Sequence, residues 1–158
     1  MALALVRGLL LALLVAVAGA ESAAQEDVKL YAVPGKYEDI KTDLTNAIVN
    51  QGLVIDFVGN INAMLTRTGA DVGSTKPVYL AAEYVMFCSA KLSRAMMEAD
   101  PRNMAFCPYV MFVYEAAAKP GEIVIGYRRP LGGASEASKA ALVEIDALLD
   151  KIAREATE

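Results

Sequence analysis

Histidine is absent from all 158 residues of the sequence, and cysteine occurs only twice. Without histidine the chain lacks the commonest general base and the imidazole ligand of metal sites. Ser–His and Cys–His nucleophile pairs are therefore impossible within this chain, as is a c-type haem attachment motif. Catalysis would depend on cysteine, acids, lysine or tyrosine alone, so a non-enzymatic function is the stronger interpretation.

Several other features of binding and catalytic sites are missing. The acidic residues are scattered and form no Asp-x-Asp loop, which gives little support to a calcium site or to catalysis by paired carboxylates. The glycines form no phosphate-binding loop. The net charge of −4 also disfavours a nucleic-acid partner, which would require a concentrated basic face. We therefore expect no cofactor and no nucleic acid.

The first 20 residues have the layout of a secretory signal peptide. Arg7 precedes the uncharged run GLLLALLVAVAGA, and Ala18-Gly19-Ala20 has the small-x-small pattern that signal peptidase cleaves. The run is shorter than the ~20 residues of a membrane-spanning helix, and no later run is long enough, so an uncleaved anchor is the weaker alternative. We expect residues 1–20 to be a leader, with a second cleavage position after residue 24. Residues 21–158 would form one periplasmic or secreted domain.

From residue 27 onward, strand and helix patterns alternate. Strands are predicted at 27–33, 53–58, 78–88 (at least in its second half), 108–115 and 122–128. Helices are predicted at 37–52, 60–69, 89–100 and from about residue 135 to the end. The order β-α-β-α-β-α-β-β-α, with a short turn between the last two strands, predicts an α+β fold. We expect a mostly antiparallel sheet with helices packed on one face.

Apolar spacing predicts which side of each helix is buried. The residues expected to be buried in the last three helices are Ile61, Met64 and Leu65, then Leu92, Ala95, Met96 and Ala99, then Leu142, Ile145, Leu149 and Ile152. Asn60 and Ser89 are expected to cap the first two of these helices, because their side-chain oxygens can accept hydrogen bonds from free backbone N–H groups.

Between about residues 27 and 130 the chain carries three motifs in order. One strand pattern ends in Cys88, a helix pattern closes in Glu98-Ala99-Asp100-Pro101, and a later strand ends in Val113-Tyr114-Glu115. In these features the sequence resembles the bacterial and archaeal family known as domain of unknown function 302. The resemblance implies the fold and a homodimer, but no agreed activity.

Both cysteines and five of the seven methionines lie between residues 84 and 112. The methionines are typical of core packing, because their flexible side chains fill irregular gaps. Cys88 and Cys107 could form a disulfide in an oxidising compartment. Alternatively, Cys88 could be a reactive thiol, because it precedes a helix N-terminus. Soft sulfur ligands also suit Cu(I), and that weaker hypothesis would use Cys88 and Cys107 with Met86, Met97 and Met104.

The remaining candidate site residues are arginines and tyrosines near the predicted sheet. Arg128 and Arg129 could hold an anion together with Tyr84 and Tyr127, because guanidinium groups match carboxylate and phosphate oxygens. Tyr84, Tyr109 and Tyr127 are expected to be exposed on the open face of the sheet. The leading functional hypothesis is a domain that binds a small ligand or a partner protein on this face, as a homodimer. The alternative is a thiol-redox or Cu(I)-handling protein that acts through Cys88 and Cys107.

Overall fold

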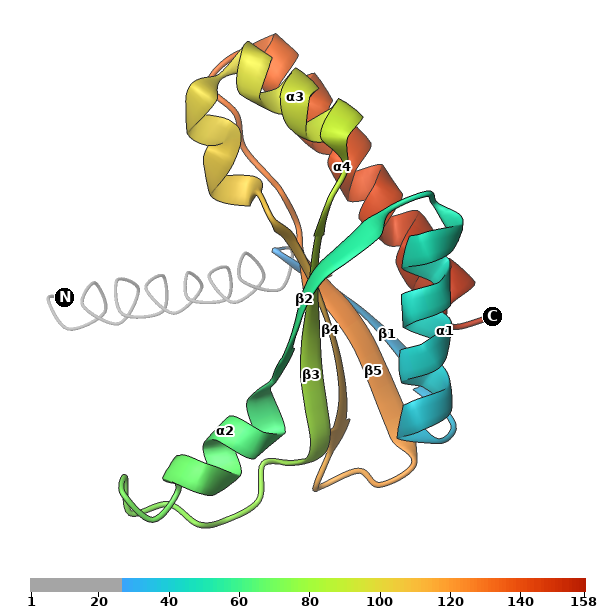
Figure 1. The fold of residues 1–158 in the computed structure, drawn as a ribbon, viewed down its shortest axis with the longest axis vertical. Coiled ribbons are helices and arrows are strands. Elements are labelled where there is room, and N and C mark those ends of the chain that lie inside the picture. The colour runs from blue at the N-terminus through green and yellow to red at the C-terminus, as the bar shows by residue number, and fades with distance from the viewer. Residues whose placement is uncertain (1–26) are drawn as a thin grey trace, which may run out of the picture.

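A computed structural model describes residues 27–158, which contain one five-stranded antiparallel sheet (Figure 1). The predicted leader and both of its cleavage positions lie outside the described residues. The strands are β1 (Val28–Pro34), β2 (Val54–Asn60), β3 (Tyr79–Cys88), β4 (Tyr109–Ala116) and β5 (Glu122–Arg128). Their order across the sheet is β1-β5-β4-β3-β2, and every neighbouring pair is antiparallel.

Four α-helices and one 3-10 helix connect and follow the strands. They are α1 (Tyr37–Asn50), α2 (Ile61–Thr68), α3 (Ala90–Ala99), the 3-10 helix η1 (Pro101–Phe106) and α4 (Glu136–Glu155). Helices α1 and α4 cover one face of the sheet, and α3 packs on α4 beyond the end of the strands (Figure 1). The predicted α+β fold is therefore confirmed. Among residues 27–158, no helix is both long enough and apolar enough to cross a membrane.

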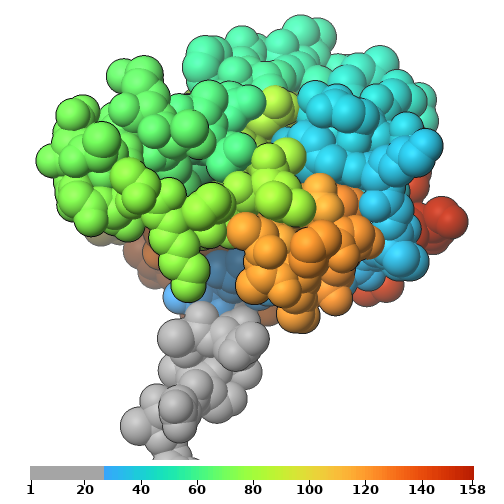
Figure 2. Space-filling view, turned by 90° about the horizontal axis from the view of Figure 1, so that it is seen from below, coloured from blue at the N-terminus to red at the C-terminus, as the bar shows by residue number. Residues whose placement is uncertain are grey.

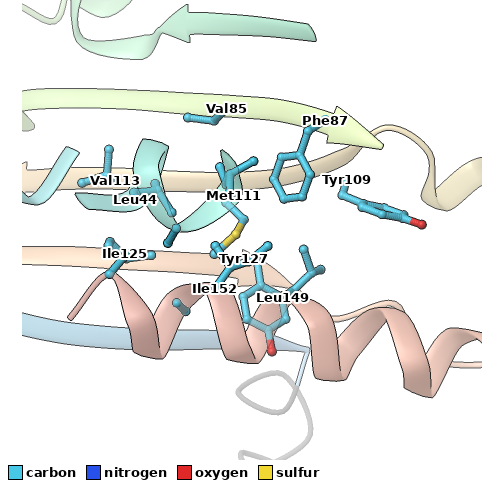
Figure 3. Close-up of a cluster of buried hydrophobic side chains, with 14 of the residues drawn as sticks. Leu44, Val85, Phe87, Tyr109, Met111, Val113, Ile125, Tyr127, Leu149 and Ile152 are labelled. Carbon is cyan, nitrogen blue, oxygen red and sulfur yellow. The ribbon is translucent and has the colours of Figure 1, made fainter. Parts of the chain in front are cut away.

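The core lies between the sheet and the two covering helices. Phe87 of β3, Met111 of β4 and Tyr127 of β5 have no exposed surface, and they lie between the sheet and the side chains of Leu149 and Ile152 (Figure 3). All four residues predicted for the apolar stripe of the last helix, from Leu142 to Ile152, are buried. The predicted stripe of α4 is confirmed.

The predicted burial is wrong for α2 and only partly right for α3. Asn60 caps α2 as predicted and accepts a hydrogen bond from the N–H of Ala63 at 2.7 Å, yet no residue of α2 is buried. This helix projects from the sheet on the side away from α1 (Figure 1), where no other element of residues 27–158 forms a layer over its apolar side chains. Ser89 caps α3, but the helix buries Ser93 and Met96 and leaves Ala95 exposed, because its neighbours are α4 and η1 rather than the sheet.

An electrostatic cluster ties α4 to the outermost strand. The Asp150 carboxylate accepts hydrogen bonds from Lys29 Nζ at 2.8 Å, from Arg154 Nε at 2.8 Å and from the hydroxyl of Tyr31. The hydrogen bond from Arg154, with those from Lys29 and Tyr31, holds the pKa of Asp150 well below its usual range. Burial, together with the hydrogen bond to Asp150, raises the pKa of Tyr31 to about 12, so this phenol remains a donor at neutral pH.

Asp150→Asn should therefore destabilise the protein at neutral pH, by about 1–2 kcal/mol for the loss of charge-assisted hydrogen bonds. Because the folded pKa is depressed, the stabilisation is fully present above the unfolded pKa of ~3.9 and is lost as the pH falls toward the lower folded value. Urea unfolding of the wild type and of Asp150→Asn at about pH 7 and about pH 3 measures the difference in their free energies of unfolding. A difference that is the same at both pH values would contradict the stabilising role of the Asp150 carboxylate.

Candidate functional site

The face of the sheet opposite α1 and α4 is the candidate site. The cross-strand register places five residues in one row across all five strands: Leu30, Gly126, Phe112, Tyr84 and Gly59. Leu30 is 51% exposed, whereas the flanking residues Tyr31, Ile125 and Tyr127 pack into the core on the other side. This row therefore crosses the middle of the uncovered side, called the open face below.

Two glycines of the row let aromatic rings lie directly on the backbone of the sheet. A Cβ at Gly59 would be 2.2 Å from the ring of Tyr84, and a Cβ at Gly126 would be 2.5 Å from the ring of Phe112. Glycine inside a strand commonly marks such a close approach. The two rings thus cover the glycine backbone of the neighbouring strands and present a flat apolar surface outward.

Further aromatic side chains extend this surface. Phe57 lies 6.0 Å from Tyr84 between ring centroids, and Tyr114 lies 6.2 Å from Phe112 with the ring planes 19° apart. Tyr79 packs against Tyr114 at 5.3 Å. These separations are those of favourable aromatic pairs. We call this set, Phe57, Tyr79, Tyr84, Phe112 and Tyr114, the aromatic platform.

A groove of about 600 Å³ runs over the platform except Phe57, and its volume is within the range of small-molecule sites. Leu30 and Val110 line it along the sheet, and Ile61 of α2 lines it at one side. Figure 2, which views the end of the sheet with the β4–β5 turn (orange), shows α2 and the loop after it (green) projecting on the side away from α1 (cyan). Helix α2, which has no buried residue of its own, thus forms one border of the groove.

The polar groups near the groove are neutral or paired. Of the lining residues within 27–158, Glu83 alone has a side chain that is charged at neutral pH, and its carboxylate accepts a hydrogen bond from Asn60 at 3.1 Å and pairs with Lys41 at 3.6 Å. Burial raises the pKa of Tyr114, so its hydroxyl remains protonated and can donate a hydrogen bond. The groove is therefore suited to an uncharged, mainly apolar molecule.

The structure separates the tyrosines that the sequence analysis placed together. Tyr84 lies on the open face, as expected, but Tyr109 is 3% exposed and Tyr127 is fully buried on the helix-covered side. The prediction that Tyr109 and Tyr127 are exposed is wrong. Tyr127 and Tyr84 therefore lie on opposite faces of the sheet, and the structure does not bring them into one site.

The two arginines have different surroundings. Arg129 Nη2 pairs with an Asp146 carboxylate oxygen at 2.8 Å, so α4 already supplies an anion to its guanidinium. Arg128 is exposed, and both arginines border a separate hollow of about 310 Å³, together with Phe106 and Pro108. The structure thus brings the two arginines together, whereas Tyr84 lies on the open face and Tyr127 is buried, so the four residues do not form one anion site.

The two cysteines, 19 positions apart in sequence, meet beside the end of the β3–β4 ladder. Cys88 ends β3, Cys107 follows η1, and their sulfur atoms are 2.6 Å apart. Burial, and then the hydrogen bond with Cys107, raises the pKa of Cys88 to about 11. The thiolate is the nucleophilic form, so this shift disfavours the reactive thiol that the helix N-terminus suggested.

The methionines proposed as soft-metal ligands lie on three elements. Met86 lies on β3, Met97 on α3 and Met104 in η1, where its side chain is mostly exposed. Within residues 27–158, Cys, Asp and Glu form no group of three or more that could hold a metal ion. A Cu(I) site would therefore depend on the cysteine pair and on methionines supplied by these three elements.

One family model matches most of this chain. The family described as "Domain of unknown function DUF302" matches residues 31–156 of this chain. The crystal structure of an uncharacterized conserved protein DUF302 from Bacillus stearothermophilus has a similar fold, with a TM-score of 0.69 at 15% sequence identity. The similarity covers 82% of this chain and 98% of that one, and at this identity it concerns the fold alone. Comparison with curated proteins finds no significant match.

Proposed function

The chain belongs to the DUF302 family, and on that premise we propose that it is a non-enzymatic binding domain for an apolar, uncharged small molecule. The ligand would lie in the groove on the open face, against the aromatic platform. The observation that carries this proposal is the seating of the Tyr84 ring on Gly59 and of the Phe112 ring on Gly126, which leaves a flat apolar surface in the middle of a sheet.

The chemistry of the groove favours a molecule with a flat apolar part. An aromatic pair contributes about 0.5–1.5 kcal/mol beyond the burial of its area, and the platform offers several rings at once. The tyrosine hydroxyls at its margin supply a few hydrogen bonds that could orient the ligand. For a molecule of about 15–20 non-hydrogen atoms we expect a Kd on the order of 10–100 µM.

We propose that the domain binds its ligand outside the cytoplasm, because of the predicted leader. Cleavage after residue 20 or 24 would release the domain into the periplasm or the medium, where we propose that it binds its ligand. A homodimer could use the same face, because two copies that paired their open faces would cover the platform. Ligand binding and dimerisation through this face would then exclude each other.

A thiol-redox or Cu(I)-handling function through Cys88 and Cys107 is the weaker alternative. A redox enzyme needs a thiolate near neutral pH, whereas burial raises the pKa of Cys88 to about 11. A Cu(I) site of the thioether type would need methionines to turn their sulfur atoms toward the pair, whereas the side chain of Met104 is mostly exposed to solvent. We therefore assign the cysteine pair no catalytic function.

Leu30→Asp should weaken binding at least tenfold, because it places a charge at the border of an apolar groove where a ligand would desolvate it. Leu30 lies on the edge strand β1 and is 51% exposed, so the fold should tolerate the change. The matched control is Val143→Asp, which adds the same charge to an exposed position of α4. Both variants and the wild type are titrated with the neutral apolar fluorophore N-phenyl-1-naphthylamine.

The oligomeric state is measured on the same samples by light scattering. Tight binding by the wild type and by Val143→Asp, with weak binding by Leu30→Asp, supports the proposal. Failure of the wild type to bind, or equal binding by all three proteins, contradicts it. A wild-type dimer that Leu30→Asp converts to a monomer, with no probe bound by either, would assign the open face to pairing between copies instead.

A further inference from the structure

We propose that Cys88 and Cys107 form an intramolecular disulfide, a two-electron modification site that ties the end of β3 to the segment before β4. The inference is independent of the ligand-binding proposal. It starts from the distance of 2.6 Å between the two sulfur atoms, which is only about half an ångström longer than a disulfide bond.

The backbone on both sides already holds the two cysteines in place. Phe87 of β3 pairs with Tyr109 of β4 at the end of the β3–β4 ladder. Cys88 follows Phe87 directly, and Cys107 lies two residues before Tyr109 in the segment that leads into β4. Cys88 also pairs with Val54 of β2. Adjacent strands lie ~4.8 Å apart, which is within the Cα separations that disulfides span, so the bond can close without displacing a strand.

The segment that the bond would close packs on α4, and Asn103 of η1 donates a buried hydrogen bond of 2.7 Å to the Ser138 hydroxyl of that helix. This segment comprises α3 and η1, and a buried hydrogen bond of 3.0 Å between the hydroxyls of Ser93 and Tyr109 links it to β4. The Ser93 hydroxyl also lies 3.7 Å from the Cys107 sulfur. The disulfide would therefore add a covalent tie where α3 and η1 leave and rejoin the sheet.

The bond would form slowly and then persist. Both thiols are half-buried, so a small oxidant can reach them. Burial raises the pKa of Cys88 to about 11, which keeps the attacking thiolate scarce near neutral pH. A thiol of high pKa is also a poor leaving group, so reduction of the finished bond would be slow as well. These properties are those of a structural tie rather than of a catalytic dithiol.

A low-molecular-weight disulfide such as oxidised glutathione supplies the oxidising equivalents. One cysteine thiolate attacks a glutathione sulfur, forms a mixed disulfide and releases one glutathione thiolate. The second cysteine thiolate then attacks the protein sulfur of the mixed disulfide and releases the second glutathione. Two electrons pass from the cysteines to glutathione, and the two thiol protons end on the two released glutathione molecules.

The test uses the full chain, first reduced and then incubated folded with oxidised glutathione. Samples are quenched with acid, alkylated with iodoacetamide in denaturant and weighed by intact mass spectrometry. We expect a product about 2 Da lighter than the reduced chain that takes up no iodoacetamide, and a linked peptide pair containing Cys88 and Cys107. Cys88→Ser and Cys107→Ser, as matched controls, should each show no such loss of mass.

Three products would overturn the proposal: free thiols on both cysteines after oxidation, separate glutathione adducts on each, or a disulfide between two chains. Amide hydrogen exchange supplies a second readout that does not depend on a variant. Exchange in residues 101–106 should be at least tenfold slower in the oxidised protein than in the reduced one. Equal exchange in the two states would contradict the tie between this segment and the sheet.

Discussion

Leu149→Ala should lower the free energy of unfolding by about 2–4 kcal/mol. Leu149 is 3% exposed and lies in the buried stripe of α4, against the face of the sheet that carries Met111 and Tyr127 (Figure 3). Truncation to alanine removes buried apolar surface and leaves a cavity that the surrounding strands cannot fully close. Urea or guanidinium unfolding followed by circular dichroism measures the change.

The matched control is Val143→Ala on the same helix, because Val143 is 66% exposed. It should change the free energy of unfolding by no more than about half a kcal/mol, as surface substitutions generally do. A similarly small effect of Leu149→Ala would mean that α4 contributes little to the stability of the domain. That result would contradict the two-layer packing described above.

The sequence was informative where one face of an element is apolar and the other polar. The stripe of α4 has this character, with Leu142, Ile145 and Leu149 at helical spacing and charged residues between them, and the structure buries all three. The turn between β4 and β5 was equally clear, because Pro120 and Gly121 interrupt two strand patterns. Gly121 indeed adopts a positive φ of 82° at that turn.

The sequence was misleading where both faces of an element are apolar. In β5 the run Ile123-Val124-Ile125-Gly126-Tyr127 does not alternate with polar residues, so its period cannot reveal which side faces the helices. Tyr127 was therefore placed on the wrong face. The same ambiguity hid the aromatic platform, although glycine inside a strand was a usable signal, because Gly59 and Gly126 each receive an aromatic ring.

The state of the cysteine pair and the burial of α2 depend on packing between elements that are distant in the sequence. The spacing of the two cysteines left a disulfide, a reactive thiol and a Cu(I) site open, and only the register of β3 against β4 places their sulfur atoms together. The missing burial of α2 has a similar cause. Its apolar spacing is helical, but among residues 27–158 no other layer reaches the side of the sheet from which it projects.

Tyr84→Ala combined with Phe112→Ala should weaken the binding of an apolar ligand about a hundredfold. Each ring should contribute roughly 1–1.5 kcal/mol of contact with the ligand, and 1.4 kcal/mol corresponds to a factor of ten in affinity. Both rings lie on the open face rather than in the core below it, so the variant should fold. Circular dichroism and a thermal melt of the variant provide the check.

The most direct test of the binding proposal is a fluorescence titration of N-phenyl-1-naphthylamine into the wild type, this double variant and a control. The control combines Val72→Ala with Val143→Ala, which truncates two exposed side chains away from the platform. We predict saturable binding with a Kd on the order of 10–100 µM for the wild type and the control, and a Kd about a hundredfold weaker for the double variant. Equal affinity of all three proteins, or no saturable binding by the wild type, would contradict the assignment of the open face as the binding site.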